Sequence, residues 1–206
     1  MAILLPQLFT AVLAIGLGSF IWSQAPASRV NRAFAFYTLA LSTWLISQAI
    51  GVPFQGSPAE AFFWSKVCYT GVPFITATMY HFVAACCRVE VRRPSLKTAY
   101  LFGLLCVLLS WTTPWIISGV HQFSWGYFTA AGTFHPIFLV FFFWVYARCL
   151  SVFLHAYHQP NPTLFTRNQS RYLLASLLIT GLGSVDYLPE YGFNMYPKGY
   201  IFEIAF

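Results

Sequence analysis

Three ionisable residues lie inside strongly apolar segments, where a charge is costly unless it is paired or functional. Lys66 lies about two helical turns into one segment, Glu203 lies at a comparable depth in the last segment, and Asp186 lies near the end of another. A Lys66–Glu203 or Lys66–Asp186 ion pair lowers the cost of burial. Three interpretations remain open: a structural pair, a site that senses a ligand or an ion, or a Lys66 ammonium that reaches the interface unpaired.

Aromatic residues form a second group of candidates. Trp125 and Tyr196 are among several aromatic residues in the connections between the apolar segments. Aromatic belts at a membrane interface explain such residues without any binding role. The alternative is an aromatic-lined ligand pocket that faces outward. Trp125 and Tyr196 therefore join the three charged residues as candidate ligand-binding positions.

The sequence carries no pattern typical of a metal site or of catalysis. No two histidines have the i, i+4 spacing of a helical metal site, and His155 and His158 have no thiolate or carboxylate beside them. There is no Gly-x-Ser-x-Gly motif and no glycine-rich phosphate loop. The run Gly181-Leu182-Gly183-Ser184 is typical of close helix packing in membranes. We expect no metal, no cofactor and no catalytic residue in this chain.

The composition excludes an ordinary soluble domain. Of 206 residues, 58% are hydrophobic and only 8% are charged, whereas soluble domains average about 25% charged residues. We therefore expect the chain to be solvated by the lipid bilayer. The net charge of +6 does not indicate nucleic-acid binding, because the basic residues lie in connections beside apolar segments and form no patch with interleaved aromatic residues.

Seven apolar segments resemble membrane-spanning helices, each of which needs about 20 residues. The expected spans cover residues 2–22, 33–52, 59–87, 98–117, 133–154, 172–188 and 196–206. The last segment is too short to cross, so we expect the seventh helix to be truncated at the chain end and a cytoplasmic output domain to follow residue 206. The sequence predicts an all-α integral membrane protein, a seven-helix transmembrane bundle that forms a single domain over residues 1–206.

Basic residues occur in alternate connections between these spans. The first, third and fifth connections hold, in order, Arg29 and Arg32; Arg88, Arg92, Arg93 and Lys97; and Arg148, Arg167 and Arg171. Short connections rich in Lys and Arg stay in the cytoplasm. This alternation predicts a multi-pass protein with its N-terminus outside and its C-terminus in the cytoplasm.

Several short stretches resemble the N-terminal seven-transmembrane region of bacterial sensor histidine kinases and some diguanylate cyclases. The resembling stretches are Asn31-Arg32-Ala33-Phe34, Trp44, Phe63-Trp64-Ser65-Lys66, Tyr69-Thr70-Gly71, His81-Phe82, Tyr187-Leu188-Pro189 with Gly192, and Tyr196-Pro197-Lys198-Gly199. Each stretch is short, and the ordered set carries the resemblance over nearly the whole chain.

The resemblance implies a sensory input domain in the inner membrane, which the seventh helix couples to a cytoplasmic kinase or cyclase. It also implies a homodimer in the full-length protein. It does not identify the signal, which is either a small molecule or a state of the membrane. Two alternatives belong to other classes. A small multi-pass transporter or channel usually shows internal repeats with matched broken helices, and an intramembrane enzyme needs clustered catalytic groups.

Overall fold

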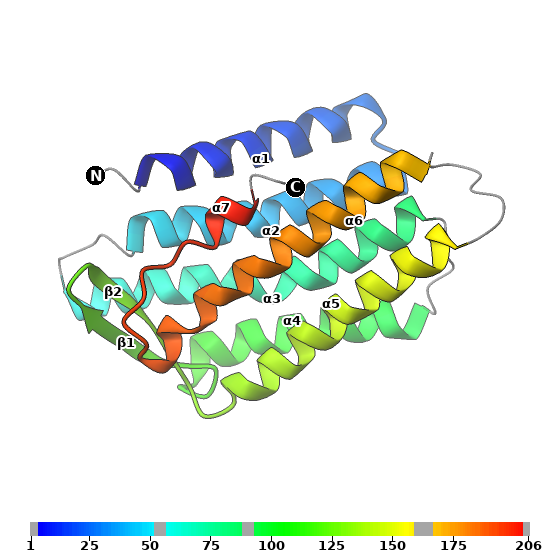
Figure 1. The fold of residues 1–206 in the computed structure, drawn as a ribbon. Helices are drawn as coiled ribbons and strands as arrows, with labels where there is room; N and C mark the ends of the chain where they lie inside the picture. The colour runs from blue at the N-terminus through cyan, green and yellow to red at the C-terminus, as the bar shows by residue number, and fades with distance from the viewer. Residues whose placement is uncertain (1–3, 52–56, 88–92, 159–166, 204–206) are drawn as a thin grey trace.

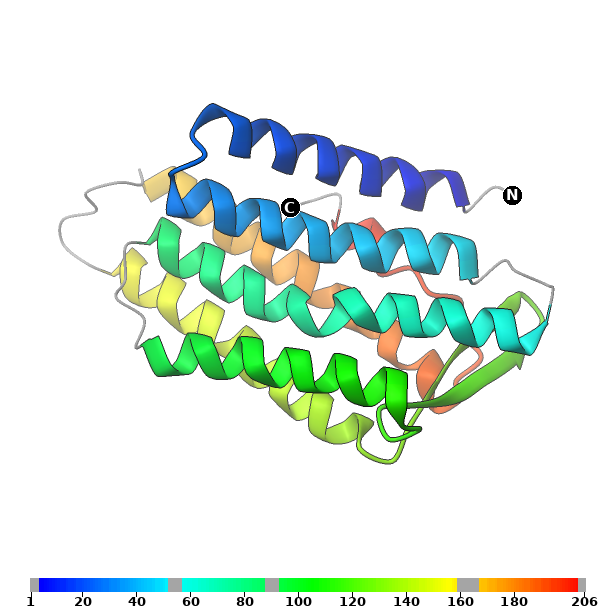
Figure 2. The ribbon, with the colours of Figure 1, turned by 180° about the vertical axis from the view of Figure 1, so that it is seen from behind.

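The chain folds into a bundle of long helices that lie side by side with their axes roughly aligned (Figures 1 and 2). The computed structural model describes residues 4–51, 57–87, 93–158 and 167–203. The long helices are α1 (Leu4–Gln24), α2 (Arg29–Gly51), α3 (Pro58–Cys86), α4 (Arg93–Thr112), α5 (His135–Tyr157) and α6 (Arg167–Gly181). The 3-10 turns η1 (Leu182–Tyr187) and η2 (Pro189–Tyr191) follow α6, and the short helix α7 (Tyr200–Glu203) packs against η1, α6 and α1.

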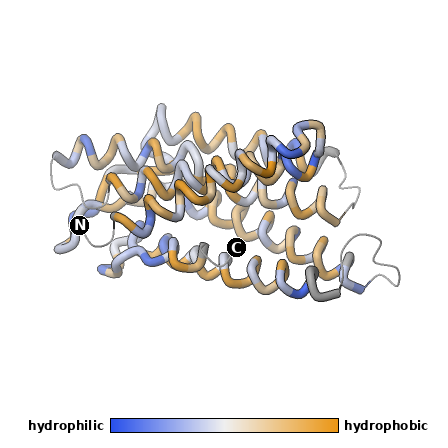
Figure 3. Tube along the Cα trace, turned by 90° about the horizontal axis from the view of Figure 1, so that it is seen from above, coloured by the Kyte–Doolittle hydropathy of each residue, from blue (hydrophilic) through white to orange (hydrophobic). Residues whose placement is uncertain are grey.

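The outer surface of this bundle is apolar, as expected of a protein in lipid. Large side chains such as Leu5, Leu101 and Val140 are more exposed than buried, and hydrophobic residues follow the helices over most of their length (Figure 3). Five segments are long and apolar enough to cross a membrane: Leu5–Gln24, Arg29–Gly51, Ser95–Thr112, His135–His155 and Arg171–Tyr191. Helix α3 is also long enough, with 29 residues, and about half of them are buried inside the bundle.

Helix α3 forms the centre of the bundle, and its sequence explains where it begins. The Ser57 side chain accepts a hydrogen bond from the Glu60 amide, and the Glu60 side chain accepts one from the Ser57 amide, which is a capping box followed by Pro58 in the first turn. Farther along, Gly71 allows α3 to approach α2, because a Cβ at this position would lie 2.6 Å from the Ala40 carbonyl oxygen. The α2–α3 contact is the most extensive between helices.

The expectation of an all-α fold is wrong for the connection between α4 and α5. Strands β1 (Ile117–Phe123) and β2 (Gly126–Ala131) form an antiparallel hairpin there. Helix α4 accordingly ends at Thr112, five residues before the predicted end of the fourth span. Gly126 has a φ of 139°, a backbone conformation that suits glycine in a tight turn. The hairpin joins the two helices outside their apolar stretches, where its exposed polar residues Ser118 and Gln122 can face water.

The sixth and seventh spans also differ from the expected continuous helices. The α-helix of the sixth span ends at Gly181 and continues as the 3-10 turn η1. Gly181 packs against the Tyr146 ring, leaving no room for a Cβ, so this glycine does serve close packing as predicted. Helix α7 begins at Tyr200, after Pro197, and residues 204–206 lie outside the described part of the chain.

The two ends of the bundle are chemically different. At one end, the end of α1 lies near the starts of α2, α4 and α6 (Figure 1), and these helices begin with Arg29, Arg93 and Arg167. Arg88 and Arg92 lie outside the described residues. At the other end lie the hairpin, η2 and the start of α3. The predicted basic connections therefore gather at one end of the bundle.

Substitution of Gly71 tests the close approach of α2 and α3. Gly71→Ala places a methyl group against backbone that has to move, so we expect a loss of about 1–3 kcal/mol in the free energy of unfolding. Gly16→Ala in α1 is the matched control, since nothing lies within 4 Å of its Cβ position. Denaturant or thermal unfolding in detergent measures both. Equal stabilities for the two variants would contradict the close approach of α2 and α3.

Candidate functional site

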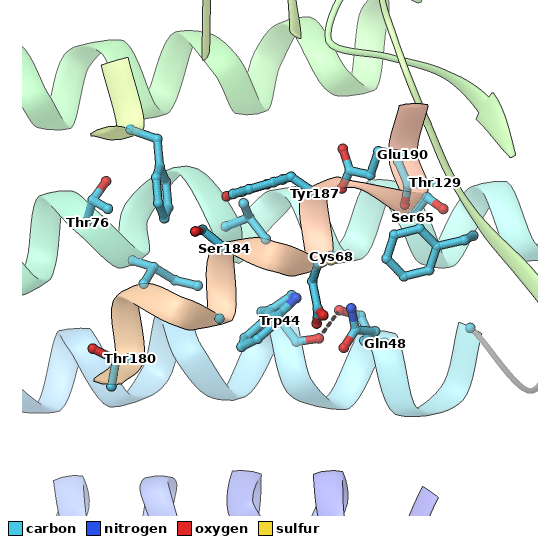
Figure 4. Close-up of a pocket in the computed structure, with 18 of the residues that line it drawn as sticks. Trp44, Gln48, Ser65, Cys68, Thr76, Thr129, Thr180, Ser184, Tyr187 and Glu190 are labelled. Carbon is cyan, nitrogen blue, oxygen red and sulfur yellow. Dashed lines mark hydrogen bonds between the residues drawn. The ribbon is translucent and has the colours of Figure 1, made fainter. Parts of the chain in front are cut away.

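A cavity of about 90 Å³ lies between α2, α3, α5, β2 and the η1–η2 segment. Thr129 and Glu190 lie near one end of it, the end at the hairpin, and Thr76 and Thr180 lie toward the other (Figure 4). It therefore extends from the hairpin end toward the middle of the bundle. Of the 26 lining residues, nine are polar or charged and the others are apolar, aromatic or glycine. This composition is typical of small-molecule sites.

Asp186 lines this cavity from η1 and is only 6% exposed. Its Oδ1 atom accepts hydrogen bonds from the backbone amides of Lys198 and Gly199, at 2.9 and 2.8 Å. The approach requires glycine, because a Cβ on Gly199 would lie 2.5 Å from Asp186 Oδ2. This carboxylate thus ties the wall of the cavity to the residues that immediately precede α7.

The second oxygen of Asp186 is not satisfied. Gln48 lies beside the carboxylate, held by a hydrogen bond of 3.1 Å from Gln7, but no hydrogen bond of ordinary length reaches Oδ2 from the described residues. Thr76 Oγ1, farther into the cavity, is also buried without a hydrogen-bond partner there. Buried polar atoms are rarely left unpaired, and each one indicates a missing ligand, ion or water.

A second buried network closes the hairpin end of the cavity. Tyr69 of α3 donates a hydrogen bond of 2.6 Å to Glu190 Oε2, and its hydroxyl also lies 2.6 Å from His135 Nε2. His135 Nε2 lies 2.9 Å from the same Glu190 oxygen, and His135 Nδ1 lies 2.8 Å from the Tyr191 hydroxyl. Both nitrogens of this fully buried imidazole are therefore satisfied. The network joins α3, the start of α5 and η2.

The hairpin is attached to this network through the backbone. His121 Nε2 on β1 lies 3.1 Å from the Glu190 carbonyl oxygen. At the hairpin turn, Trp125 Nε1 donates to Asn194 Oδ1 at 3.0 Å, and the Trp125 ring lies 5.2 Å from the Tyr196 ring. The two aromatic residues predicted from the sequence are thus brought together. They lie over the connection that leads to α7 and do not line the cavity.

The other predicted residues have different positions. Lys66 does not pair with Asp186: its ammonium donates to the Trp111 carbonyl oxygen at 3.4 Å and lies 4.7 Å from the centre of the Phe62 ring. The predicted Lys66–Asp186 ion pair is therefore not formed, because Lys66 faces α4 while Asp186 faces the cavity. Glu203 belongs to α7, but its side chain lies outside the described residues, so the Lys66–Glu203 pair is not described either.

Sequence reasoning missed Glu190, His135 and Tyr69 as members of a site. One signal was available, since Asp186 and Glu190 are carboxylates four residues apart in a chain that has only five acidic residues. No comparable signal joins Tyr69 to His135, because only the packing of α3 against α5 brings them together. Within the described residues, no group of three or more His, Cys, Asp or Glu side chains could hold a metal ion.

Comparisons with known proteins agree with this architecture. The family model described as the N-terminal 7TM region of histidine kinase matches residues 6–206, which is nearly the whole chain. Searches of curated proteins and of solved structures found no match. The resemblance noted in the sequence is thereby confirmed, and the apolar helices agree with a multi-pass location in a membrane. The chain belongs to the family of N-terminal 7TM regions of histidine kinases, and it is a membrane sensory input domain.

Proposed function

We propose that the signal is a ligand that binds in the cavity between α2, α3, α5 and η1–η2, in the outer half of the membrane. The observation that carries this proposal is the position of Asp186. One carboxylate oxygen holds the backbone just before α7, and the other has no hydrogen-bond partner in the described part of the chain, in a residue that lines the cavity. A ligand that binds Asp186 acts directly on the attachment of α7.

The proposed mechanism is a shift between two helix arrangements. A ligand shifts such an equilibrium only by its difference in affinity for the two states. A ligand bound to Asp186 strengthens or weakens its hydrogen bonds with the backbone amides of Lys198 and Gly199. These two residues set where α7 begins. Trp125 and Tyr196 cover the same connection from the outer side. Lys66 anchors the outer part of α3 to α4, and Glu203 continues α7 beyond the attachment.

We also propose a membrane topology and an output domain for this chain. The chain lies in the inner membrane, with its N-terminus outside and its C-terminus in the cytoplasm. The basic end of the bundle faces the cytoplasm. The seventh helix leads to a kinase or cyclase output domain in a homodimer. A transporter or channel is the less favoured function, because the family that matches is a signalling region.

Cysteine labelling tests this orientation in intact cells. Ser124→Cys at the exposed hairpin turn should react with a membrane-impermeant maleimide added outside, because the hairpin end faces out. Ala27→Cys in the turn between α1 and α2 is the matched exposed position at the basic end, and it should react only after permeabilisation. Both variants carry Cys87→Ser, since the other four cysteines are buried. The opposite labelling pattern would reverse the proposed topology.

Filling the cavity tests the proposed site in the full-length protein. Ser184→Phe places a ring in the cavity, so we expect its autophosphorylation rate to change roughly fivefold or more, the lower range of allosteric coupling. Ser151→Phe on the exposed face of α5 is the control. Both serines donate a hydrogen bond to the carbonyl three residues earlier, but only Ser184 lines the cavity.

An unchanged rate in Ser184→Phe, with Ser151→Phe also unchanged, would contradict a signalling role for the cavity. A change of the same size in both variants would do so as well, since it would indicate a general effect of an added ring. Phosphorylation from labelled ATP in lipid nanodiscs measures each rate.

A further inference from the structure

We infer that the ligand of this cavity is a small organic cation, an alkylammonium or a quaternary ammonium ion. This inference rests on the proposed function, since it names the ligand class of the same site. Three features of the cavity support it: the charge of its lining residues, its aromatic side chains and its size.

The charged residues that line the cavity are acidic. Asp186 and Glu190 are the acidic residues of its lining, and no Lys or Arg lines it in the part of the chain that the structure describes. Glu190 accepts a hydrogen bond from Tyr69 and lies 2.9 Å from His135 Nε2, so its carboxylate is occupied within the protein. Asp186 Oδ1 accepts two backbone hydrogen bonds and the Gln48 side chain lies beside the carboxylate, but Oδ2 has no hydrogen-bond partner of ordinary length among the described residues.

The nearest candidate cations are directed elsewhere. Lys198 donates its backbone amide to Asp186, but its side chain is exposed. Lys66 is held by the Trp111 carbonyl and the Phe62 ring. A buried carboxylate without a partner is costly, and a cation supplied by the ligand removes this cost. An anion at the same place would be repelled.

Aromatic side chains provide the second feature. Trp44 from α2 and Tyr187 from η1 both extend into the space around which the other lining residues are arranged (Figure 4). Trp64 from α3 and Phe142 and Phe143 from α5 also line the cavity. Aromatic rings attract cations through their faces, Trp most strongly, and rings arranged around a carboxylate recognise ammonium groups.

The size of the cavity limits the cation. A volume of about 90 Å³ is below the 150 Å³ or so that accommodates benzene, and it corresponds to about three water molecules. It accepts about four or five non-hydrogen atoms, so the part of a ligand that lies inside the cavity is small. A neutral apolar molecule of this size leaves Asp186 Oδ2 and Thr76 Oγ1 unpaired, whereas an ammonium ion that carries N–H groups satisfies the first of them.

Calorimetric titration of the full-length protein in nanodiscs of zwitterionic lipid tests the inference. The probes are tetramethylammonium and ethylammonium, and tert-butanol is the neutral control of similar size. We expect saturable binding of at least one ammonium ion and none of tert-butanol. Asp186→Asn should weaken that binding by roughly tenfold or more, because it removes the charged acceptor.

Glu60→Gln is the matched control, since it removes a carboxylate at the exposed start of α3, and Gln also suits a capping box. It should bind the ammonium ion like the unmodified protein. Trp44→Leu gives a second, uncharged variant that tests the aromatic contribution, with weaker ammonium binding expected. The comparison of probes on the unmodified protein does not depend on how any variant folds.

The outcomes separate this inference from the proposed function. If neither ammonium ion binds, or tert-butanol binds as well, the ligand class is wrong. If the Ser184→Phe variant still changes the output in that case, the cavity keeps its signalling role. If Asp186→Asn and Glu60→Gln both bind like the unmodified protein, Asp186 is not the recognition group and the inference is overturned. If an ammonium ion binds but Ser184→Phe leaves the output unchanged, the proposed function fails while the binding site remains.

Discussion

The attachment of Asp186 to the backbone amides of Lys198 and Gly199 is the interaction on which the outer half of this bundle depends. In lipid, an unpaired backbone amide is costly, and so is an unpaired carboxylate. The two costs offset each other here, because Oδ1 accepts both amide hydrogens where the chain approaches α7. The same bonds hold η1 against the cavity. One side chain therefore links the start of α7 to the wall of the cavity.

The Tyr69–His135–Glu190 network complements this attachment. It fixes η2 to α3 and α5, so that the segment between Asp186 and Glu190 is held at both ends. The hairpin covers the network, and His121 bonds the Glu190 backbone. These groups are paired, whereas Asp186 Oδ2 and Thr76 Oγ1, which both belong to residues of the cavity lining, have no hydrogen-bond partner among the described residues. Such atoms in a cavity are where a ligand has the greatest effect.

Much of this architecture could be predicted from the sequence, because apolar length and basic connections are local properties. Helices α2 and α3 lie within a few residues of the expected spans, and the charge at Asp186 correctly identified a buried residue. The hairpin was missed because its strands do not alternate regularly between polar and apolar residues. The fourth span was predicted too long because Trp115, Ile116 and Ile117 continue the apolar run of α4, although Pro114 was a signal for the end of the helix. The 3-10 turn after Gly181 was missed because the apolar run of α6 likewise continues past that residue.

The partners of the charged residues could not be predicted. Depth along the helices suggested Glu203 as a partner of Lys66, with Asp186 as an alternative. Depth does not determine which face of α3 a side chain occupies, and Lys66 turns toward Trp111. Glu190 was overlooked because it follows a proline at the end of a span, where an interfacial charge needs no explanation. Its contacts with Tyr69 and His135 depend on three segments that are far apart in sequence.

The central claim is that the state of Asp186 reaches the output domain through the start of α7. Autophosphorylation of the full-length Gly199→Ala variant tests it most directly, with Gly119→Ala as the control. A Cβ on Gly199 would press on the Asp186 carboxylate, whereas nothing lies within 4 Å of the Cβ position of Gly119. The account predicts a rate changed by roughly fivefold or more in Gly199→Ala and unchanged in Gly119→Ala. A Gly199→Ala protein that signals like the unmodified one would contradict it.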